Sequence, residues 1–432
     1  LCSVLLFFGA DLIADLSNNP MAIEAIRAIS PAVFFVSIVA VVRGYFQGMS
    51  NMIPTALSQI IEASGKVVLG LVFAYFAGVK GFDDSMKAAF AILGVTVGEV
   101  LAAVVMLCYA ASASKKSYSN NLNDHCRSYK ELFRVLLLTV IPVTLTSSVT
   151  SLTTLIDTGM LVSRLQEVGF TLEQSNALYG VYTGQAFTMF NFPQTLITAL
   201  ATAVLPAMAG AYAQQNHTMA AKNMGSAMRI AMLIALPAAI GYIVLAHPII
   251  SLLFAEDTSG LVDENLGGSL LMVLALAIPC VALVGLTNAI LQAIGQMKVP
   301  VITMLIGGIC KILLNYFLVG NPKIHIYGAP VGTLACYTLI ATLNLIYLKQ
   351  YIKLPKIGKL FVRPFIACVG MGAAAAIVYR LLGDKLSNVA VLPAICVAAA
   401  TYAVLLVALN ALEKDDILML PAGKRIVKLL RL

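Results

Sequence analysis

Long apolar runs separated by short polar linkers make up most of this chain. A transmembrane helix needs about 20 predominantly apolar residues, and runs of that length recur along the whole sequence. They cover residues 1–16, 28–48, 54–78, 87–111, 132–162, 177–212, 228–254, 267–293, 299–320, 326–348, 360–382 and 388–412. The pattern predicts an all-α, polytopic membrane protein with about 12 transmembrane helices. The run at 177–212 is too long for one straight helix, so we expect it to kink at Pro193 or to leave the membrane early at Pro206.

Composition agrees with this class and excludes several others. Hydrophobic residues make up 60% of the chain and charged residues 11%, whereas soluble domains average about 25% charged residues. The sequence contains no GxxxxGKS phosphate loop, no HExxH motif and no soluble run long enough for a catalytic domain. We therefore expect neither enzymatic activity nor a metal centre.

Basic residues gather in alternate linkers. One set of linkers includes residues 112–134, 349–363 and the C-terminal tail, whereas the other set has few basic residues and includes the acidic stretch 254–268. The positive-inside rule places the basic set, and with it the C-terminus, in the cytoplasm. The formal net charge of +8 then needs no nucleic acid as partner, because basic linkers face anionic membrane lipid.

An internal repeat relates two pairs of predicted helices, around residues 41–75 and 286–319. In each copy an apolar helix ends in Gln and Gly, a short turn follows, a Pro opens the next helix, and a Lys lies further along it. The matched residues are Gln47, Gly48, Pro54 and Lys66 in the first copy and Gln292, Gly295, Pro300 and Lys311 in the second. Both copies have the same predicted orientation, which is typical of a parallel repeat.

Counting helices upstream of the repeat leaves the first copy short of two. We therefore expect a complete chain of two six-helix lobes and a final pair, with the first two helices missing here. The predicted divisions are the rest of the N-terminal lobe, the C-terminal lobe, the final two helices and a basic cytoplasmic tail, at residues 1–130, 131–350, 351–412 and 413–432.

Charged residues inside apolar runs are the main candidates for a functional site. A Lys or Asp at the centre of a spanning helix costs roughly 2.5–3.5 kcal/mol, and such residues usually face a bundle interior or a watery cavity. Glu62, Lys66 and Lys311 lie within such runs. A lobe-symmetric pair of ammonium groups is suited to binding a pyrophosphate. Alternatively, Glu62 and Lys66 neutralise each other within one helix, and Lys311 pairs with a carboxylate elsewhere.

Further polar residues extend the candidate site. Asp157 and Glu99 are candidates for a coupling cation, Na⁺ or H⁺, and Arg164, two turns beyond Asp157, is a candidate for phosphate or sugar. Structural alternatives are an interfacial anchor for Arg164 and a protonated core carboxyl for Glu99. The polar side chains within membrane helices, which either contact sugar hydroxyls or join helices at roughly 0.6 kcal/mol each, are Gln185, Asn191 and Asn315.

Three stretches resemble a known transporter family. They are ISPAVFFVSIVAVVRGYFQGMSNMIPTALSQIIEASGKVVLGL (29–71), LYGVYTGQAFTMFNFPQTLITALATAVLPAMA (178–209) and LQAIGQMKVP (291–300). The chain resembles the stage V sporulation protein B and lipid II flippase branch of the multidrug, oligosaccharidyl-lipid and polysaccharide exporter superfamily. The resemblance spans essentially the whole chain and is most specific in the first stretch.

The resemblance implies a two-lobed (6+6+2) fold of about 14 helices around a central cavity, working by alternating access. In that family the last two helices form a hydrophobic groove, which falls here on 360–382 and 388–412. The family also uses cationic residues on its first two helices, which we expect to be missing here.

The resemblance and the charges together predict a flippase in the bacterial cytoplasmic membrane, for peptidoglycan or spore cortex synthesis. The implied substrate is a lipid II type, undecaprenyl-pyrophosphate-linked oligosaccharide. We expect a monomer in contact with membrane lipid, without a cofactor apart from a coupling cation, and cell-wall synthesis proteins are candidate partners.

Three alternatives stay open. A cation-coupled multidrug or polysaccharide exporter of the same superfamily should have more acidic than basic cavity residues. A membrane glycosyltransferase would need a carboxylate-bearing catalytic loop. In a non-transporting scaffold for wall synthesis, neutralising Lys66 or Lys311 should leave function intact.

Overall fold

The computed structural model describes the chain except residues 17–22, 50, 118–127, 255–261, 353–356 and 410–432. The described residues are helical and contain no strand, which confirms the all-α prediction. They form two compact units, an N-terminal unit of residues 1–127 and a C-terminal unit of residues 128–432. The finer division predicted from the sequence stays a prediction, and its basic tail at 413–432 lies outside the described residues.

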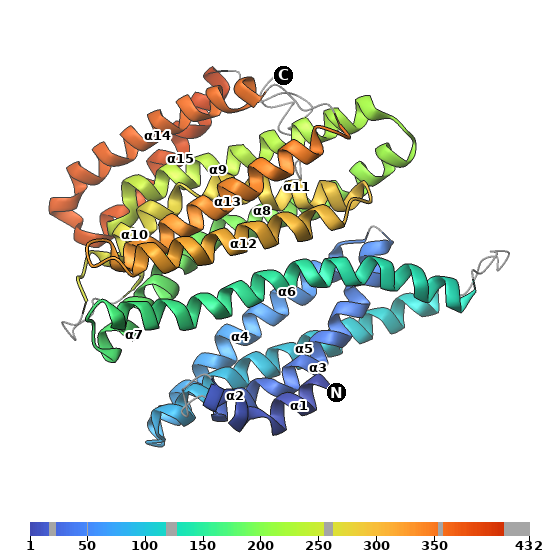
Figure 1. Cartoon of the computed structure of the whole chain (residues 1–432), viewed down its shortest axis with the longest axis horizontal. Helices are drawn as coiled ribbons and strands as arrows, with labels where there is room; N and C mark the ends of the chain where they lie inside the picture. Colours follow the sequence, from blue (N-terminus) through green and yellow to red (C-terminus); the bar gives the residue numbers. More distant parts are fainter. Residues whose placement is uncertain (17–22, 50, 118–127, 255–261, 353–356, 410–432) are drawn as a thin grey trace. The chain divides into compact units, whose positions relative to one another are not determined.

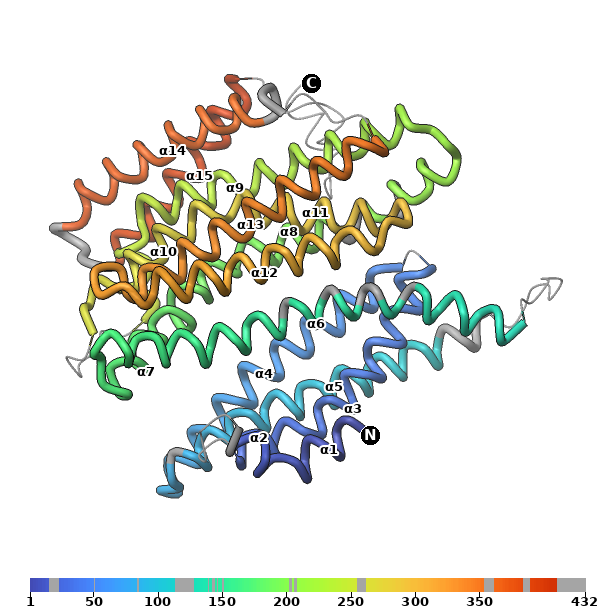
Figure 2. The backbone as a smooth tube through the Cα atoms, in the orientation of Figure 1, coloured from blue at the N-terminus to red at the C-terminus, as the bar shows by residue number. Residues whose placement is uncertain are grey.

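The N-terminal unit is built on three long helices. Its elements are α1 (Cys2–Phe8), α2 (Ala10–Leu16), α3 (Ile23–Gly48), α4 (Ile53–Val79) and α5 (Asp84–Ser117). Figures 1 and 2 show α5 running alongside both α3 and α4, with which it packs closely. The run at 1–16 was predicted as one helix, but it forms two of seven residues each, because the first ends at Gly9. Pro54 lies in the first turn of α4, where a missing N–H costs nothing.

The C-terminal unit holds the remaining elements. They are α6 (Tyr129–Glu167), α7 (Leu172–Gly180), η2 (Val181–Ala186), α8 (Phe187–Ala213), α9 (His217–Leu253), α10 (Leu266–Ala275), α11 (Ile278–Ala293), α12 (Lys298–Val319), η3 (His325–Tyr327), α13 (Gly328–Leu348), α14 (Ile357–Leu386), η4 (Ser387–Ala390) and α15 (Val391–Ala408). Helix α12 packs against α6 and α13, whereas α14 packs against α15 and α9 (Figure 1).

Many of these helices carry apolar side chains on their outer faces. Large exposed ones include Phe34, Leu71, Tyr75, Leu313 and Phe317. Among the described residues eight helices are long and apolar enough to cross a membrane, or nine if α10 and α11 form one bent span. The prediction of a polytopic membrane protein is confirmed, whereas the count of about 12 helices stays a prediction.

Two spans are interrupted where the sequence places helix-breaking residues. Helices α10 and α11 meet at a bend of 48°, directly before Pro279, whose ring disfavours helical geometry at the preceding residue. Helix α9 is kinked at Leu245, which has φ −114° and ψ 17°, three residues before Pro248.

The break expected in the run at 177–212 takes a different form. Residues 181–186 form a π-helix, η2, and α8 then runs past Pro193 and Pro206 to Ala213. The Thr188 hydroxyl donates a hydrogen bond to the Thr183 carbonyl, five residues back, over 3.2 Å. A π-turn of this kind is frequent at functional sites, and here it sets the direction in which Tyr182 and Gln185 project.

Candidate functional site

Glycines bring α4 and α5 into close contact in the N-terminal unit. A Cβ added to Gly65 would lie 2.7 Å from the Cα of Gly98, and one added to Gly94 would contact the backbone of Gly70. Small residues of this kind allow the backbones of two membrane helices to approach. Lys66 and Glu99 directly follow Gly65 and Gly98, so the same contact brings their side chains together.

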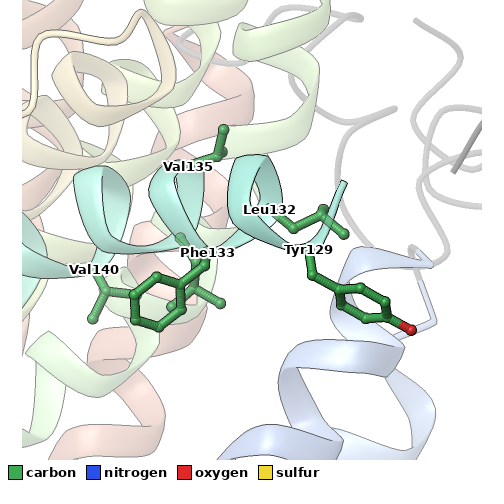
Figure 3. A pocket seen from close by; sticks show the side chains of 6 residues that line it. Tyr129, Leu132, Phe133, Val135 and Val140 are labelled. Atoms are coloured by element: carbon green, nitrogen blue, oxygen red, sulfur yellow. The ribbon is translucent and has the colours of Figure 1, made fainter. Parts of the chain in front are cut away.

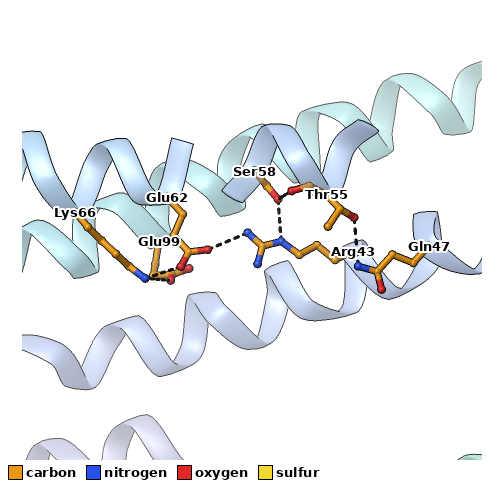
Figure 4. A network of polar contacts seen from close by, with 7 residues as sticks. All are labelled: Arg43, Gln47, Thr55, Ser58, Glu62, Lys66 and Glu99. Carbon is orange, nitrogen blue, oxygen red and sulfur yellow. Dashed lines mark hydrogen bonds and ion pairs between the residues drawn. The ribbon is translucent and has the colours of Figure 1, made fainter. Parts of the chain in front are cut away.

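Four charged side chains form one cluster in this unit, which we call the Arg43 cluster: Arg43, Glu62, Lys66 and Glu99. Glu62 lies between the two cations: its Oε2 accepts a hydrogen bond from Arg43 at 2.9 Å, and its Oε1 accepts one from Lys66 Nζ at 2.5 Å. Lys66 Nζ also lies 3.5 Å from Glu99 Oε1. Figure 4 shows the chain of contacts from Lys66 to Arg43. The cluster contains equal numbers of basic and acidic groups.

The cluster is unevenly exposed. The side chain of Lys66 is 37% exposed, whereas that of Glu99 is 6% exposed. The side chains of Arg43 and Glu62 are 19% and 18% exposed, so Lys66 is the most exposed member of the cluster. Glu99 thus has a cationic neighbour, Lys66.

Arg43 is the member of the cluster that sequence analysis missed. Its Nε donates a hydrogen bond to Ser58 Oγ at 2.8 Å, in addition to its contact with Glu62. Helices α3 and α4 are joined by a tight turn, and Arg43 lies eight residues before Asn51 whereas Ser58 lies seven after it. Equal distance from the turn of a helical hairpin was the available signal, since it places the two residues at the same depth.

A second cluster, which we call the Asp157 cluster, lies in the C-terminal unit and consists of Asp157, Lys311 and Asn315. Asp157 Oδ2 forms an ion pair with Lys311 Nζ, and Asp157 Oδ1 accepts a hydrogen bond from Asn315 Nδ2 at 3.1 Å. The side chains of Lys311 and Asp157 are 14% and 8% exposed. Asn315 is fully buried, and its Oδ1 has no hydrogen-bond partner. The carboxylate that the sequence required for Lys311 is thus Asp157, on α6.

Residues of α13 and η2 lie beside this second cluster. A Cβ added to Gly332 of α13 would contact Asn315 Oδ1, so α13 packs directly on the Asn315 side chain. The next residue, Thr333, has its Oγ1 3.3 Å from the hydroxyl of Tyr182, a buried residue of the π-helix η2. The cluster is therefore flanked by α13 and η2.

Comparison with known proteins assigns the chain to a family. The sequence model of the lipid II flippase MurJ matches residues 3–397. The chain belongs to the lipid II flippase MurJ family. The resemblance deduced from the sequence is confirmed.

Individual proteins similar to this MurJ-family chain agree with the family assignment. It is similar to stage V sporulation protein B of Bacillus subtilis (strain 168), with 23% identity over 98% of this chain and 80% of that protein. It is also similar to the lipid II flippase MurJ of the same organism, with 25% identity over 89% of this chain and 72% of that protein.

Solved structures share the fold. A lipid II flippase MurJ in an inward closed conformation has a TM-score of 0.65 and 17% identity, over 93% of this chain and 79% of that one. An outward-facing multidrug resistance MATE family transporter has a TM-score of 0.65 and 19% identity, over 83% of this chain and 75% of that one. At these identities the likeness concerns the fold.

The remaining predicted residues of the MurJ-family chain lie apart from the two clusters. The guanidinium of Arg164 lies 3.9 Å from the ring centroid of Tyr316, donates to the Tyr316 carbonyl at 3.2 Å and pairs with Glu167. Arg164 therefore packs on α12 near its end, as expected if it has the structural role of an interfacial anchor. Gln185 packs against Gly267 of α10, and Asn191 is half-buried on α8.

An apolar pocket of about 340 Å³ lies where α8, α9, α14 and α15 meet in the MurJ-family chain. Its walls include Phe192, Gly241, Leu245, Met371 and Tyr402. The kink at Leu245 shapes one wall, and the last two described helices supply another. The resemblance to the transporter family implied a hydrophobic groove on these last two helices, and that groove stays a prediction.

A second apolar surface lies at the start of α6. Figure 3 shows Tyr129, Leu132, Phe133, Val135 and Val140 projecting from this single helix. The described residues that line it all come from this one helix and are exposed, so the surface is open there. It is suited to contact with lipid.

Removing the Glu62 carboxylate should destabilise the N-terminal unit, because Arg43 would lose its ion pair and Lys66 would keep only Glu99, at 3.5 Å. We expect Glu62→Gln to lower the free energy of unfolding by roughly 3–5 kcal/mol, the range for breaking a buried ion pair. The matched control is Glu24→Gln, which removes an exposed pair with Arg27 at 3.3 Å and should cost less than about 1 kcal/mol. Thermal melts of the purified variants measure the difference, and equal melting temperatures would contradict the prediction.

Proposed function

We propose that this protein is a flippase that moves a lipid II type precursor across the bacterial cytoplasmic membrane, for peptidoglycan or spore cortex synthesis. Membership of the lipid II flippase MurJ family supports the substrate class. The observation that carries the proposal within the chain is the Arg43 cluster, which holds two cations inside membrane-spanning helices and leaves one of them accessible.

The cluster is suited to a pyrophosphate headgroup. Guanidinium and ammonium groups bind phosphate through charge-assisted hydrogen bonds, and Lys66 is exposed enough to make them. In the absence of substrate, Glu62 and Glu99 neutralise the two cations, which avoids unpaired charge at the depth of the membrane. We propose that the pyrophosphate replaces Glu62 as the partner of Lys66 and Arg43, and that Glu62 re-forms its contacts when the substrate leaves.

Lys311 is less suited to this role than Lys66. Its side chain is 14% exposed, and its ammonium already pairs with Asp157. We therefore propose Arg43 and Lys66 as the primary ligands of the pyrophosphate, whereas the predicted symmetric role of Lys311 stays a prediction. Gln185 and Asn191 stay candidates for contacts with sugar hydroxyls, and Arg164 for a phosphate or sugar.

The apolar pocket at α14 and α15 is suited to the lipid part of the substrate. At about 340 Å³ it can hold a segment of a polyprenyl chain while the rest stays in the bilayer. Burying apolar surface there stabilises the complex without any polar contact. We propose that this pocket holds the chain end nearest the headgroup during translocation.

Topology and assembly follow the sequence predictions. We propose that the C-terminus lies in the cytoplasm, because the basic linkers at 112–134 and 349–363 would then face anionic lipid. We propose a monomer that works by alternating access, with cell-wall synthesis proteins as candidate partners.

Neutralising Lys66 should slow translocation of lipid II. Loss of a charge-assisted contact of roughly 1.5–3 kcal/mol predicts a fall of about 10- to 100-fold for Lys66→Gln. The measurement is transfer of labelled lipid II in cells depleted of their own flippase, at matched membrane levels. Lys80→Gln is the control, because Lys80 lies at the end of the same helix, over the ring of Phe76.

Two outcomes would contradict different parts of this account. If wild type does not transfer lipid II, the substrate is another lipid or a drug. If wild type and Lys66→Gln transfer it equally, the Arg43 cluster is structural.

Filling the apolar pocket should slow translocation without unfolding the protein. Gly241 lines the pocket, and a Cβ at this position would meet open space, so Gly241→Leu places a side chain in the cavity. Gly285→Leu is the control, since Gly285 on α11 also has open space around it and is not among the pocket-lining residues. We expect slower lipid II transfer for Gly241→Leu alone, with both variants melting near wild type. Unchanged transfer by Gly241→Leu would exclude this pocket as the lipid site.

A further inference from the structure

Asp157 is the residue at which the sequence predicts a coupling cation, and its surroundings can be tested for that role. A bound metal ion such as Na⁺ is surrounded by several oxygen atoms that face it. In this structure both carboxylate oxygens of Asp157 are already engaged, Oδ2 by the Lys311 ammonium and Oδ1 by the Asn315 amide at 3.1 Å. Each oxygen thus keeps only part of its lone-pair capacity, and a metal ion would have to share the carboxylate with the Lys311 ammonium, which the arrangement disfavours.

Charge leads to the same conclusion. Asp157 supplies one negative charge to this cluster, and Lys311 supplies one positive charge. Adding a metal cation would leave the cluster positive inside a membrane-spanning bundle, where uncompensated charge is expensive. The buried Asn315 Oδ1, which has no hydrogen-bond partner, shows that a spare oxygen acceptor nevertheless lies beside the carboxylate.

We propose that the Lys311 ammonium takes the place of a free coupling cation at Asp157. The C-terminal unit then carries its cation as part of the chain, and no metal ion binds there. Because the proposal concerns ion binding, it does not rest on the identity of the transported substrate.

Removing the ammonium should convert the cluster into a cation site. In Lys311→Met the carboxylate of Asp157 loses its ion-pair partner, while the Asn315 Oδ1 stays available. Thr333 directly follows Gly332, the residue against which Asn315 Oδ1 packs, and its hydroxyl lies 3.3 Å from the hydroxyl of Tyr182. Carboxylate, amide and hydroxyl oxygens are suitable ligands for a hard cation such as Na⁺.

The test compares thermal melts of the purified full chain in NaCl, KCl and choline chloride at equal ionic strength. We expect the melting temperature of wild type to be the same in all three salts. For Lys311→Met we expect NaCl to raise it by on the order of 5 °C relative to choline chloride, saturably with concentration. Lys311→Met/Asp157→Asn is the control, which should melt alike in all three salts.

Three results would overturn the proposal, and one further result would support it. Stabilisation of wild type by Na⁺ or K⁺ that is lost in Asp157→Asn would show that a free cation binds beside Lys311. A folded Lys311→Met variant that does not respond to Na⁺ would show that the ammonium fills no cation site. Recovery of Lys311→Met in NaCl but not in choline chloride would support the proposal. If Lys311→Met folds in neither salt while Lys311→Met/Asp157→Asn folds, the ion pair of Lys311 and Asp157 is structural only and the proposal fails.

Discussion

Local neutralisation of charge is the constraint on which both clusters of this protein depend. A single unpaired Lys or Asp at the centre of a spanning helix costs several kcal/mol, which is a large part of the stability of a typical domain. Arg43, Lys66 and Lys311 each contact a carboxylate, and these contacts join helices rather than only residues of one helix. The ion pairs therefore join α3, α4 and α5 in one unit, where glycines also bring α4 and α5 together, and α6 and α12 in the other.

Charge is neutralised differently in the two units. The Arg43 cluster has two cations and leaves Lys66 37% exposed, so a ligand can exchange with a carboxylate. The Asp157 cluster is a single buried pair in which Asn315 fixes the second carboxylate oxygen. Exposure rather than residue type distinguishes a site suited to an anionic headgroup from one suited to an internal cation. The internal repeat aligns Lys66 with Lys311, yet their surroundings have diverged.

Sequence analysis found what depends on local pattern. Hydrophobic runs gave nearly all helix positions, and the spacing of Glu62 and Lys66 predicted their contact, which the structure shows at 2.5 Å. The partner of Lys311 could not be predicted, because Asp157 is 154 residues away and only the packing of α6 on α12 brings them together. Arg43 met the criterion of a charge within an apolar run, since it lies in the run at 28–48, but its partners on the next helix were not apparent from the pattern. The π-helix at 181–186 has no strong signal in the sequence.

The central claim is that the Arg43 cluster recognises a pyrophosphate. The most direct measurement is the affinity of the purified chain for undecaprenyl pyrophosphate and for undecaprenol, which lacks the charge. We predict that wild type prefers the pyrophosphate by about tenfold or more, and that Arg43→Gln/Lys66→Gln loses this preference while still binding undecaprenol. Equal affinities in wild type, or a preference that survives in the double variant, would contradict the claim.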